Sequence, residues 1–337
     1  MPRPARLQRK VFVTRAIDSA ALERLRAAAS VNVWRGEMPP PASTLRSAVA
    51  NADAVLTMLT DKIDARMIAG APRLRVISNM AVGVDNIDLE AATRAGIAVG
   101  HTPGVLTEAT ADLAFGLLMA TARRIAEGDR YVRARKWRTW GPATMLGHDV
   151  HSSTLGLIGF GAIGQAMARR ATGFGMRVLY LKHSPEKRFA GAIGVTLPRL
   201  LAESDYVSLH VPLTPKTRHM IGAREFARMK PGAILINTAR GGVVDQAAMV
   251  AALKSGHLGG AGLDVTDPEP ITPGDPILRL DKVVITPHIG SASIVTRASM
   301  TAMAVDNIIA VFGGRLPRWC VNPQVRLPPL AGNRPLK

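Results

Sequence analysis

Three side chains suited to acid–base and carboxylate chemistry lie in glycine- or proline-rich segments of the second half of the chain. They are Arg240 in the segment 236–242, Glu269 in 262–270 and His288 in 286–291. An arginine can bind a carboxylate through two parallel hydrogen bonds. A histidine can exchange a proton near neutral pH, and a neighbouring carboxylate fixes its tautomer and stabilises its charged form. Together the three side chains could bind an α-keto acid and protonate its carbonyl oxygen as a hydride arrives.

Each of these segments follows an apolar run typical of a buried strand. The runs are 233–238, 262–265 and 283–286. In open parallel α/β sheets, ligands bind at the carboxyl ends of the strands. A loop arginine alone is more often a surface charge, and a lone histidine is more often structural. Three such residues at neighbouring strand ends favour a catalytic site.

A glycine motif earlier in the chain indicates a binding site for the hydride donor that such chemistry needs. The apolar run 154–158 is followed by Gly159, Gly161 and Gly164 at G-x-G-x-x-G spacing, then by a helical stretch and a second apolar run, 177–181. Gly159 can adopt the dihedral angles of a tight turn, Gly161 lets the backbone approach a pyrophosphate, and Gly164 lets the helix pack close to the strand. The helix N-terminus offers free N–H groups to phosphates. The motif in this context predicts a dinucleotide site.

The end of the second strand of this motif indicates which dinucleotide is bound. An NAD-specific site needs an acidic residue there for the ribose hydroxyls, but the chain has Lys182, His183 and Ser184. These side chains favour the 2′-phosphate of NADP(H). Because a neutral histidine discriminates weakly, use of NAD(H) stays open.

Strand-like and helix-like runs alternate along most of the chain, which predicts parallel sheets covered on both faces. We expect a first α/β unit with strands 11–13, 31–34, 54–59, 75–78 and 97–99. A second, doubly wound unit is expected to have six strands, at 154–158, 177–181, 206–210, 233–238, 262–265 and 283–286. The predicted helices are 19–29, 89–94, 106–125, 162–171, 224–229, 246–255 and 291–312.

Composition narrows the class of protein. The 337 residues are 47% hydrophobic, which is enough for two α/β domains. A single cysteine, Cys320, excludes an internal disulfide and a cysteine metal cluster, and we expect no metal site. Apolar stretches look too short or too interrupted to span a bilayer, so we expect a cytoplasmic protein without a membrane partner.

The formal net charge of +18 does not accompany any recognisable nucleic-acid-binding module, so we expect no nucleic-acid partner. The excess charge favours the approach of anionic substrates and cofactors. Its densest run, 123–138, is interpreted as a solvated helix face or an oligomer arm. The segment 131–151 does not resemble a core element, yet it carries Trp137 and Trp140, which suggests contact with a second subunit.

Several motifs in a fixed order resemble the D-isomer-specific 2-hydroxyacid dehydrogenases, and within them most closely the glyoxylate/hydroxypyruvate reductases. The resemblance extends from about residue 10 to residue 323. It is carried by Ala-Val-Gly-Val-Asp-Asn-Ile-Asp at 81–88, Ala-Thr-Ala-Asp-Leu-Ala at 109–114, Asn-Thr-Ala-Arg-Gly at 237–241, Gly-Leu-Asp-Val at 262–265 and Pro-His-Ile-Gly-Ser at 287–291.

The resemblance implies a role for each matching residue. Arg240 corresponds to the substrate-binding arginine, His288 to the acid–base and Glu269 to its carboxylate partner. The backbone of Val82 and Gly83 corresponds to the loop that holds the substrate carboxylate, with Leu59 and Trp140 as pocket walls. The implied cofactor-binding residues are Thr110, Gly159, Phe160, Gly161, Ala162, Ile163, Gly164, Lys182, His183, Ser184, Val211, Pro212, Thr217, Thr238, Ala239, Asp264, His288 and Gly290.

The resemblance also implies the architecture and the reaction. A flavodoxin-like substrate domain would comprise residues 1–104 and 292–337, and a Rossmann dinucleotide-binding domain residues 105–291, with a homodimerisation arm at about 123–150. The implied reaction is reduction of glyoxylate or hydroxypyruvate to the D-2-hydroxy acid. Longer acids such as 2-ketogluconate, and activity like that of D-3-phosphoglycerate dehydrogenase, stay open. A non-enzymatic alternative is a dinucleotide-sensing corepressor.

Overall fold

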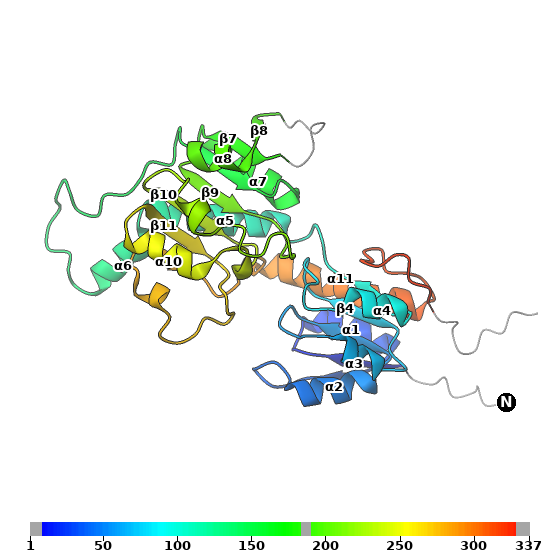
Figure 1. Cartoon of the computed structure of the whole chain (residues 1–337). Helices are drawn as coiled ribbons and strands as arrows, with labels where there is room; N and C mark the ends of the chain where they lie inside the picture. Colours follow the sequence, from blue (N-terminus) through cyan, green and yellow to red (C-terminus); the bar gives the residue numbers. More distant parts are fainter. Residues whose placement is uncertain (1–8, 183–189, 328–337) are drawn as a thin grey trace, which may run out of the picture. The chain divides into compact units, whose positions relative to one another are not determined.

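The computed structural model describes residues 9–182 and 190–327, and the chain divides into two compact units (Figure 1). One unit joins the chain up to Val105 with the chain from Ser293 onward. The other unit is Leu106–Ala292.

The first unit contains a five-stranded parallel sheet with the order β2-β1-β3-β4-β5. This is the flavodoxin-like strand order expected from the sequence. Its strands are β1 (Lys10–Val13), β2 (Ser30–Val33), β3 (Ala54–Thr57), β4 (Val76–Asn79) and β5 (Ala98–Gly100). Its helices are α1 (Ser19–Ala28), α2 (Ala42–Ala50), α3 (Ala65–Ala69), α4 (Leu89–Arg94) and α11 (Ile294–Phe312).

Alternation along these strands places helices on both faces of the sheet. Val55 and Ile77 belong to one apolar cluster with side chains of α2, α3 and α4. Ser78, one position further along β4, donates a hydrogen bond to the Ala304 carbonyl of α11 at 2.8 Å on the opposite face. Because successive side chains of a strand point to opposite faces, both faces of this sheet are buried.

The second unit contains a seven-stranded parallel sheet with the order β12-β11-β10-β9-β6-β7-β8. Helices α5 and α7 share an apolar cluster on one face, and residues of α8, α9 and α10 share a cluster on the other. Its strands are β6 (Thr154–Ile158), β7 (Arg177–Leu181), β8 (Ala192–Val195), β9 (Tyr206–Leu209), β10 (Ala233–Asn237), β11 (Leu258–Leu263) and β12 (Val283–Ile285). Its helices are α5 (Thr107–Ala122), α6 (Ile125–Arg133), α7 (Ala162–Gly173), α8 (Leu197–Glu203), α9 (Ala223–Phe226) and α10 (Gln246–Lys254), with 3₁₀ turns η1 (Gly241–Val243) and η2 (Pro276–Arg279).

The structure confirms the doubly wound class but corrects the number of strands, which is seven among the described residues of this unit. The additional strand, β8, is a short edge strand that contains Gly194 and pairs with β7. Glycine is weak in a strand by itself, but here it leaves room for Tyr180, since an added Cβ would lie 2.8 Å from the tyrosine hydroxyl. Helices α2, α3 and α8, of nine, five and seven residues, were also not predicted.

The predicted helix 106–125 is wrong at its end. Helix α5 stops at Ala122, Arg124 has a left-handed backbone with φ 53°, and α6 begins at Ile125. Apolar periodicity continues across this break, so the sequence does not show it. Helix α6 has no buried residue in the chain.

Helix α11 corrects the expectation about membranes. It is the one helix among the described residues that is long and apolar enough to cross a bilayer, with a mean hydropathy of 1.3. Its buried residues, including Ala304 and Ile308, lie in the core of the first unit, where the helix packs on β3, β4 and β5. A core position accounts for its apolar composition.

Close packing of α5 on β11 depends on glycine, and this can be tested. A Cβ at Gly262 would lie 2.9 Å from Ile236 Cδ1 and 3.0 Å from Thr121 Oγ1. We predict that Gly262→Val lowers the free energy of unfolding by about 1–3 kcal/mol through overpacking. Gly116→Ala, at an exposed position of α5 with no atom within 4 Å of the added carbon, should instead raise it by about 0.5–1 kcal/mol. Equal denaturation midpoints for both variants would contradict this packing account.

Candidate active site

The three candidate catalytic residues follow three neighbouring strands of the second unit. Arg240 follows β10, Glu269 follows β11 and His288 follows β12, and these strands are adjacent in the sheet. Parallel pairing brings their carboxyl ends to one edge. The topology therefore gathers the three loops that the sequence places far apart.

His288 and Glu269 form a direct pair. The imidazole Nδ1 lies 2.5 Å from Glu269 Oε1, and the two side chains are 21% and 31% exposed. Because a carboxylate only accepts, Nδ1 carries the proton in this contact. Nε2 is left to exchange a proton with a bound substrate.

The backbone of His288 is held in an uncommon conformation. Its φ of 55° lies in the left-handed region, which residues other than glycine rarely adopt. The buried carboxylate of Asp264 accepts hydrogen bonds from the Thr286 hydroxyl at 2.6 Å, the Ile289 N–H at 2.7 Å and the Gly290 N–H at 2.7 Å. The N–H of His288 donates to the Asp264 carbonyl at 2.9 Å. Asp264 thus fixes the turn that presents the imidazole.

Hydrogen bonds to neighbouring residues hold the loop that bears Arg240. The Asn237 amide donates to the Arg240 carbonyl at 2.9 Å, and the Arg240 guanidinium donates to the Ala239 carbonyl at 2.9 Å. A Cβ at Gly241 would lie 1.9 Å from the Thr266 carbonyl oxygen, so this loop packs directly against the loop that follows β11. Only glycine permits that approach.

The glycine turn has the geometry that a bound dinucleotide requires. Gly159 has φ 98°, and a Cβ there would lie 2.5 Å from the His210 carbonyl group. A Cβ at Gly164 would lie 2.2 Å from the Gly159 oxygen. A Cβ at Gly161 would instead meet no atom within 4 Å, which leaves open space beside the start of α7. Ala162 and Ile163 form the first turn of that helix, where no side chain caps the N–H groups.

Aromatic stacking connects this turn to the second strand. Phe160 and Tyr180 stack with centroids 4.3 Å apart and planes at 23°. Tyr180 precedes Leu181 and the exposed Lys182, whose N–H donates to the Val195 carbonyl at 3.1 Å. His183 and Ser184 lie outside the described residues.

Several other predicted cofactor residues surround the same sheet edge. Thr110 approaches Gly290, since a Cβ on that glycine would lie 3.4 Å from Thr110 Cγ2. Val211 adjoins the glycine turn, and the Thr217 hydroxyl donates to the Pro212 carbonyl at 2.6 Å. The Thr238 hydroxyl is buried with no hydrogen-bond partner among the described residues, and Ala239 donates to Asn237 at 3.0 Å.

His210 lies next to Gly159 at the end of β9. Its Nε2 is 2.9 Å from the Ser208 hydroxyl. Burial lowers the pKa of His210 to about 4. Its imidazole is therefore neutral at physiological pH and adds no positive charge beside the glycine turn.

The remaining predicted substrate residues are distributed over other segments. Leu59 is half-buried just after β3, and Val82 and Gly83 form a turn after β4, all in the first unit. Trp140 belongs to the second unit and is 78% exposed in the irregular segment after α6. Among the described residues, Trp140 makes no hydrogen bond to His288 or Glu269.

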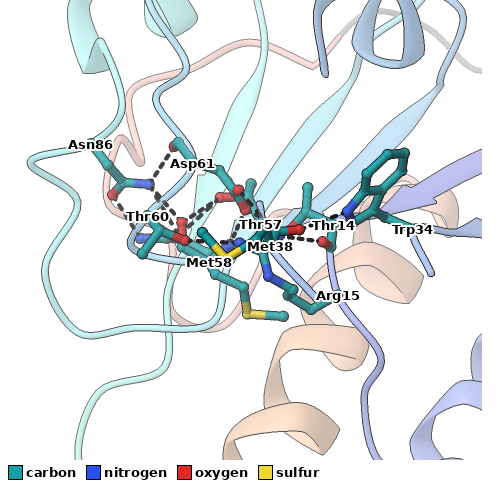
Figure 2. A network of polar contacts seen from close by, with 10 residues as sticks. Thr14, Arg15, Trp34, Met38, Thr57, Met58, Thr60, Asp61 and Asn86 are labelled. Carbon is teal, nitrogen blue, oxygen red and sulfur yellow. Dashed lines mark hydrogen bonds and ion pairs between the residues drawn. The ribbon is translucent and has the colours of Figure 1, made fainter. Parts of the chain in front are cut away.

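Polar residues that the sequence reasoning missed connect the loops of the first unit. Figure 2 shows the buried carboxylate of Asp61 accepting from the Thr14 hydroxyl at 2.5 Å and the Met58 N–H at 2.8 Å, with Arg15 at 3.6 Å. Asn86 donates to the carbonyl groups of Met58 and Asp61 at 3.1 and 2.9 Å (Figure 2). The available signals were an Asp four residues after β3 and an Asn inside the Gly-Val-Asp-Asn-Ile-Asp motif, because buried polar groups need partners.

A glycine turn at a helix N-terminus and a histidine–carboxylate pair at the same sheet edge characterise a nicotinamide-dependent dehydrogenase. A sequence profile of the D-isomer specific 2-hydroxyacid dehydrogenase NAD binding domain matches residues 115–290. The glyoxylate reductase of Korarchaeum cryptofilum is 51% identical over 320 residues, covering 94% of this chain and 96% of that protein. The chain belongs to the D-isomer specific 2-hydroxyacid dehydrogenases, as its motifs indicated.

Solved structures agree with this assignment. The TT0316 protein of Thermus thermophilus has a TM-score of 0.88 and 50% identity, covering 93% of this chain and 99% of that one. An NADPH-dependent glyoxylate/hydroxypyruvate reductase of Sinorhizobium meliloti, solved with NADP and malonate, has a TM-score of 0.86 and 31% identity, covering 96% and 99%.

We expect glycine to be needed at position 164 for backbone packing and at position 161 for nucleotide binding, and substitutions can test this difference. We predict that Gly164→Ala lowers the free energy of unfolding by about 1–3 kcal/mol, since its methyl group collides with backbone. Gly161→Ala should leave the unfolding midpoint nearly unchanged and raise the Kd for NADH and NADPH alike at least about tenfold, because the methyl group enters space that the pyrophosphate would need. Thermal unfolding and fluorescence titration measure the two effects. Unchanged affinity for both nucleotides in Gly161→Ala would contradict this prediction.

Proposed function

We propose that the chain is an NADPH-preferring reductase of short 2-keto acids, with glyoxylate and hydroxypyruvate as substrates and glycolate and D-glycerate as products. The observation that carries the proposal is the His288–Glu269 contact of 2.5 Å on loops next to the one that bears Arg240. The names of the relatives support the substrate class, since glyoxylate reductases recur among them.

In the proposed mechanism, Arg240 binds the substrate through its guanidinium and draws electron density toward the carbonyl oxygen. NADPH, when bound, supplies the hydride for the carbonyl carbon. His288 donates a proton from Nε2 to the carbonyl oxygen, which becomes the hydroxyl of the product. Glu269 accepts from Nδ1 and stabilises the protonated ring before transfer.

The proposal includes further roles for the predicted substrate residues. The N–H groups of Val82 and Gly83 bind the substrate carboxylate, and Leu59 limits the length of the acid. Trp140 serves a second copy of the chain in a homodimer formed through residues 123–150. Its high exposure in the isolated chain and the absence of buried residues in α6 support that role. A cytoplasmic location belongs to the same proposal.

Preference for NADPH rests on Lys182. This exposed side chain follows β7, and no acidic residue takes the adjoining position. The dependence of the Sinorhizobium meliloti relative on NADPH supports the preference. The N-terminal part of α7, with its open space at Gly161, fits the pyrophosphate of either nucleotide.

The proposal is tested by initial rates with NADPH and NADH against glyoxylate, hydroxypyruvate, pyruvate and 2-ketogluconate. We predict the highest kcat/KM for glyoxylate or hydroxypyruvate with NADPH. Lys182→Ala should lower kcat/KM for NADPH about tenfold, through loss of a charged phosphate contact, and change that for NADH less than about twofold. Lys254→Ala, on the exposed face of α10, is the matched control.

Two outcomes would contradict parts of this proposal. Higher efficiency with NADH would overturn the role of Lys182 and leave the family assignment intact. No turnover of any acid with either nucleotide would overturn the enzymatic proposal and favour a dinucleotide-sensing role.

A further inference from the structure

Three successive carbonyl groups in the turn after β4 each have a hydrogen-bond partner. The Ala81 carbonyl accepts from the Thr102 N–H at 2.9 Å, the Val82 carbonyl contacts His101 Nδ1 at 2.9 Å, and the Gly83 carbonyl accepts from the Asn79 amide at 2.8 Å. Within the described residues, the N–H groups of Val82 and Gly83 donate to no protein acceptor. Val82 is 39% exposed. The turn therefore presents donors to an incoming anion and keeps its acceptors turned into the protein.

Two side chains contact these carbonyl groups: Asn79 is the last residue of β4, and His101 directly follows β5. Because a carbonyl oxygen only accepts, Nδ1 of His101 carries the proton and donates to Val82. The Val82 carbonyl and the Gly83 N–H belong to one planar peptide group and point in opposite directions. A donor that fixes the carbonyl at one end consequently fixes the direction of the N–H at the other.

Hydrogen bonds hold the backbone of His101 at both its N–H and its carbonyl group. Its N–H donates to the Trp319 carbonyl at 3.1 Å, and its carbonyl accepts from the Asn307 amide at 3.1 Å. Asn307 lies on α11 and is 2% exposed. The neighbouring residue must be Gly100, because a Cβ there would lie 2.7 Å from the Asn307 side chain. The imidazole therefore projects from a fixed point.

We infer that His101 is a positioning residue for substrate: it orients the Val82–Gly83 peptide so that the Gly83 N–H points at the substrate carboxylate. The inference rests on the proposed function, in which this turn binds that carboxylate. His101 does not exchange a proton with substrate in this account. It acts through the peptide group and sets affinity for the acid.

Three substitutions at His101 test whether the position of the hydrogen-bond donor matters, or only the presence of a polar side chain. His101→Asn places an amide nitrogen where Nδ1 stands, His101→Gln places one farther out near Nε2, and His101→Leu removes the donor. We predict that His101→Leu and His101→Gln raise KM for glyoxylate about tenfold, the cost of one lost orienting hydrogen bond, and change kcat less than about threefold. His101→Asn should stay within about threefold of the wild-type KM.

Two further readouts exclude a general loss of structure. The Kd for oxalate, measured by calorimetry with the nucleotide-loaded enzyme, should follow the same order as KM and needs no turnover. KM for NADPH should be unchanged in all three variants. Lys254→Leu, which alters an exposed side chain of α10, is the control and should behave as wild type.

The outcomes distinguish the inference from the proposed function. Equal KM and oxalate Kd in the Asn, Gln and Leu variants would overturn the role of His101 while wild-type turnover of glyoxylate upheld the proposed function. Parallel loss of NADPH binding and oxalate binding in every variant would also overturn it, because His101 would then be merely structural. A wild-type enzyme that binds oxalate but reduces no 2-keto acid would contradict the proposed function, and the oxalate series would still decide on His101.

Discussion

The hydrogen bonds accepted by the Asp264 carboxylate are the interaction on which the candidate catalytic edge depends. A buried carboxylate is costly unless its oxygens are satisfied, and here three donors from the segment 286–290 satisfy them. The same bonds hold His288 in a left-handed backbone conformation that the residue would not adopt by itself. The hydrogen bonds that satisfy the buried carboxylate therefore also set the direction of the imidazole. Its Nδ1 contacts Glu269 on the neighbouring loop.

The first unit also holds a buried carboxylate near a strand end, but only its Oδ2 accepts hydrogen bonds among the described residues, while Oδ1 lies 3.6 Å from Arg15. Asp61 is a second buried carboxylate that anchors the loop after β3, and Asn86 joins that loop to the segment after β4 (Figure 2). The loops that carry Leu59, Val82 and Gly83 are thus fixed by side chains that would not contact a substrate. In both units the parallel sheet brings the loops together, and buried polar residues set their conformation.

Much of this arrangement could be predicted because it follows from short-range patterns. The glycine spacing, the alternation of strands and helices and the positions of Arg240, Glu269 and His288 after strands are all visible in the sequence. Other features depend on partners distant in the chain. One example is the hydrogen bond between His101 and Val82, and another is the bond that the Asn307 amide donates to the His101 carbonyl. Both bonds join segments that no local sequence pattern relates. The break at Arg124 was missed because apolar periodicity continues through it, and β8 because Gly194 weakens the strand signal.

The central claim is that His288 donates the proton and that Glu269 stabilises its charged form. The most direct test measures kcat for glyoxylate with saturating NADPH in the wild type, in His288→Ala and in Glu269→Gln. Loss of the proton donor in His288→Ala should lower kcat about a hundredfold or more. Loss of the carboxylate that holds Nδ1 in Glu269→Gln should lower kcat by a smaller factor of about ten. Wild-type turnover in either variant would contradict these roles.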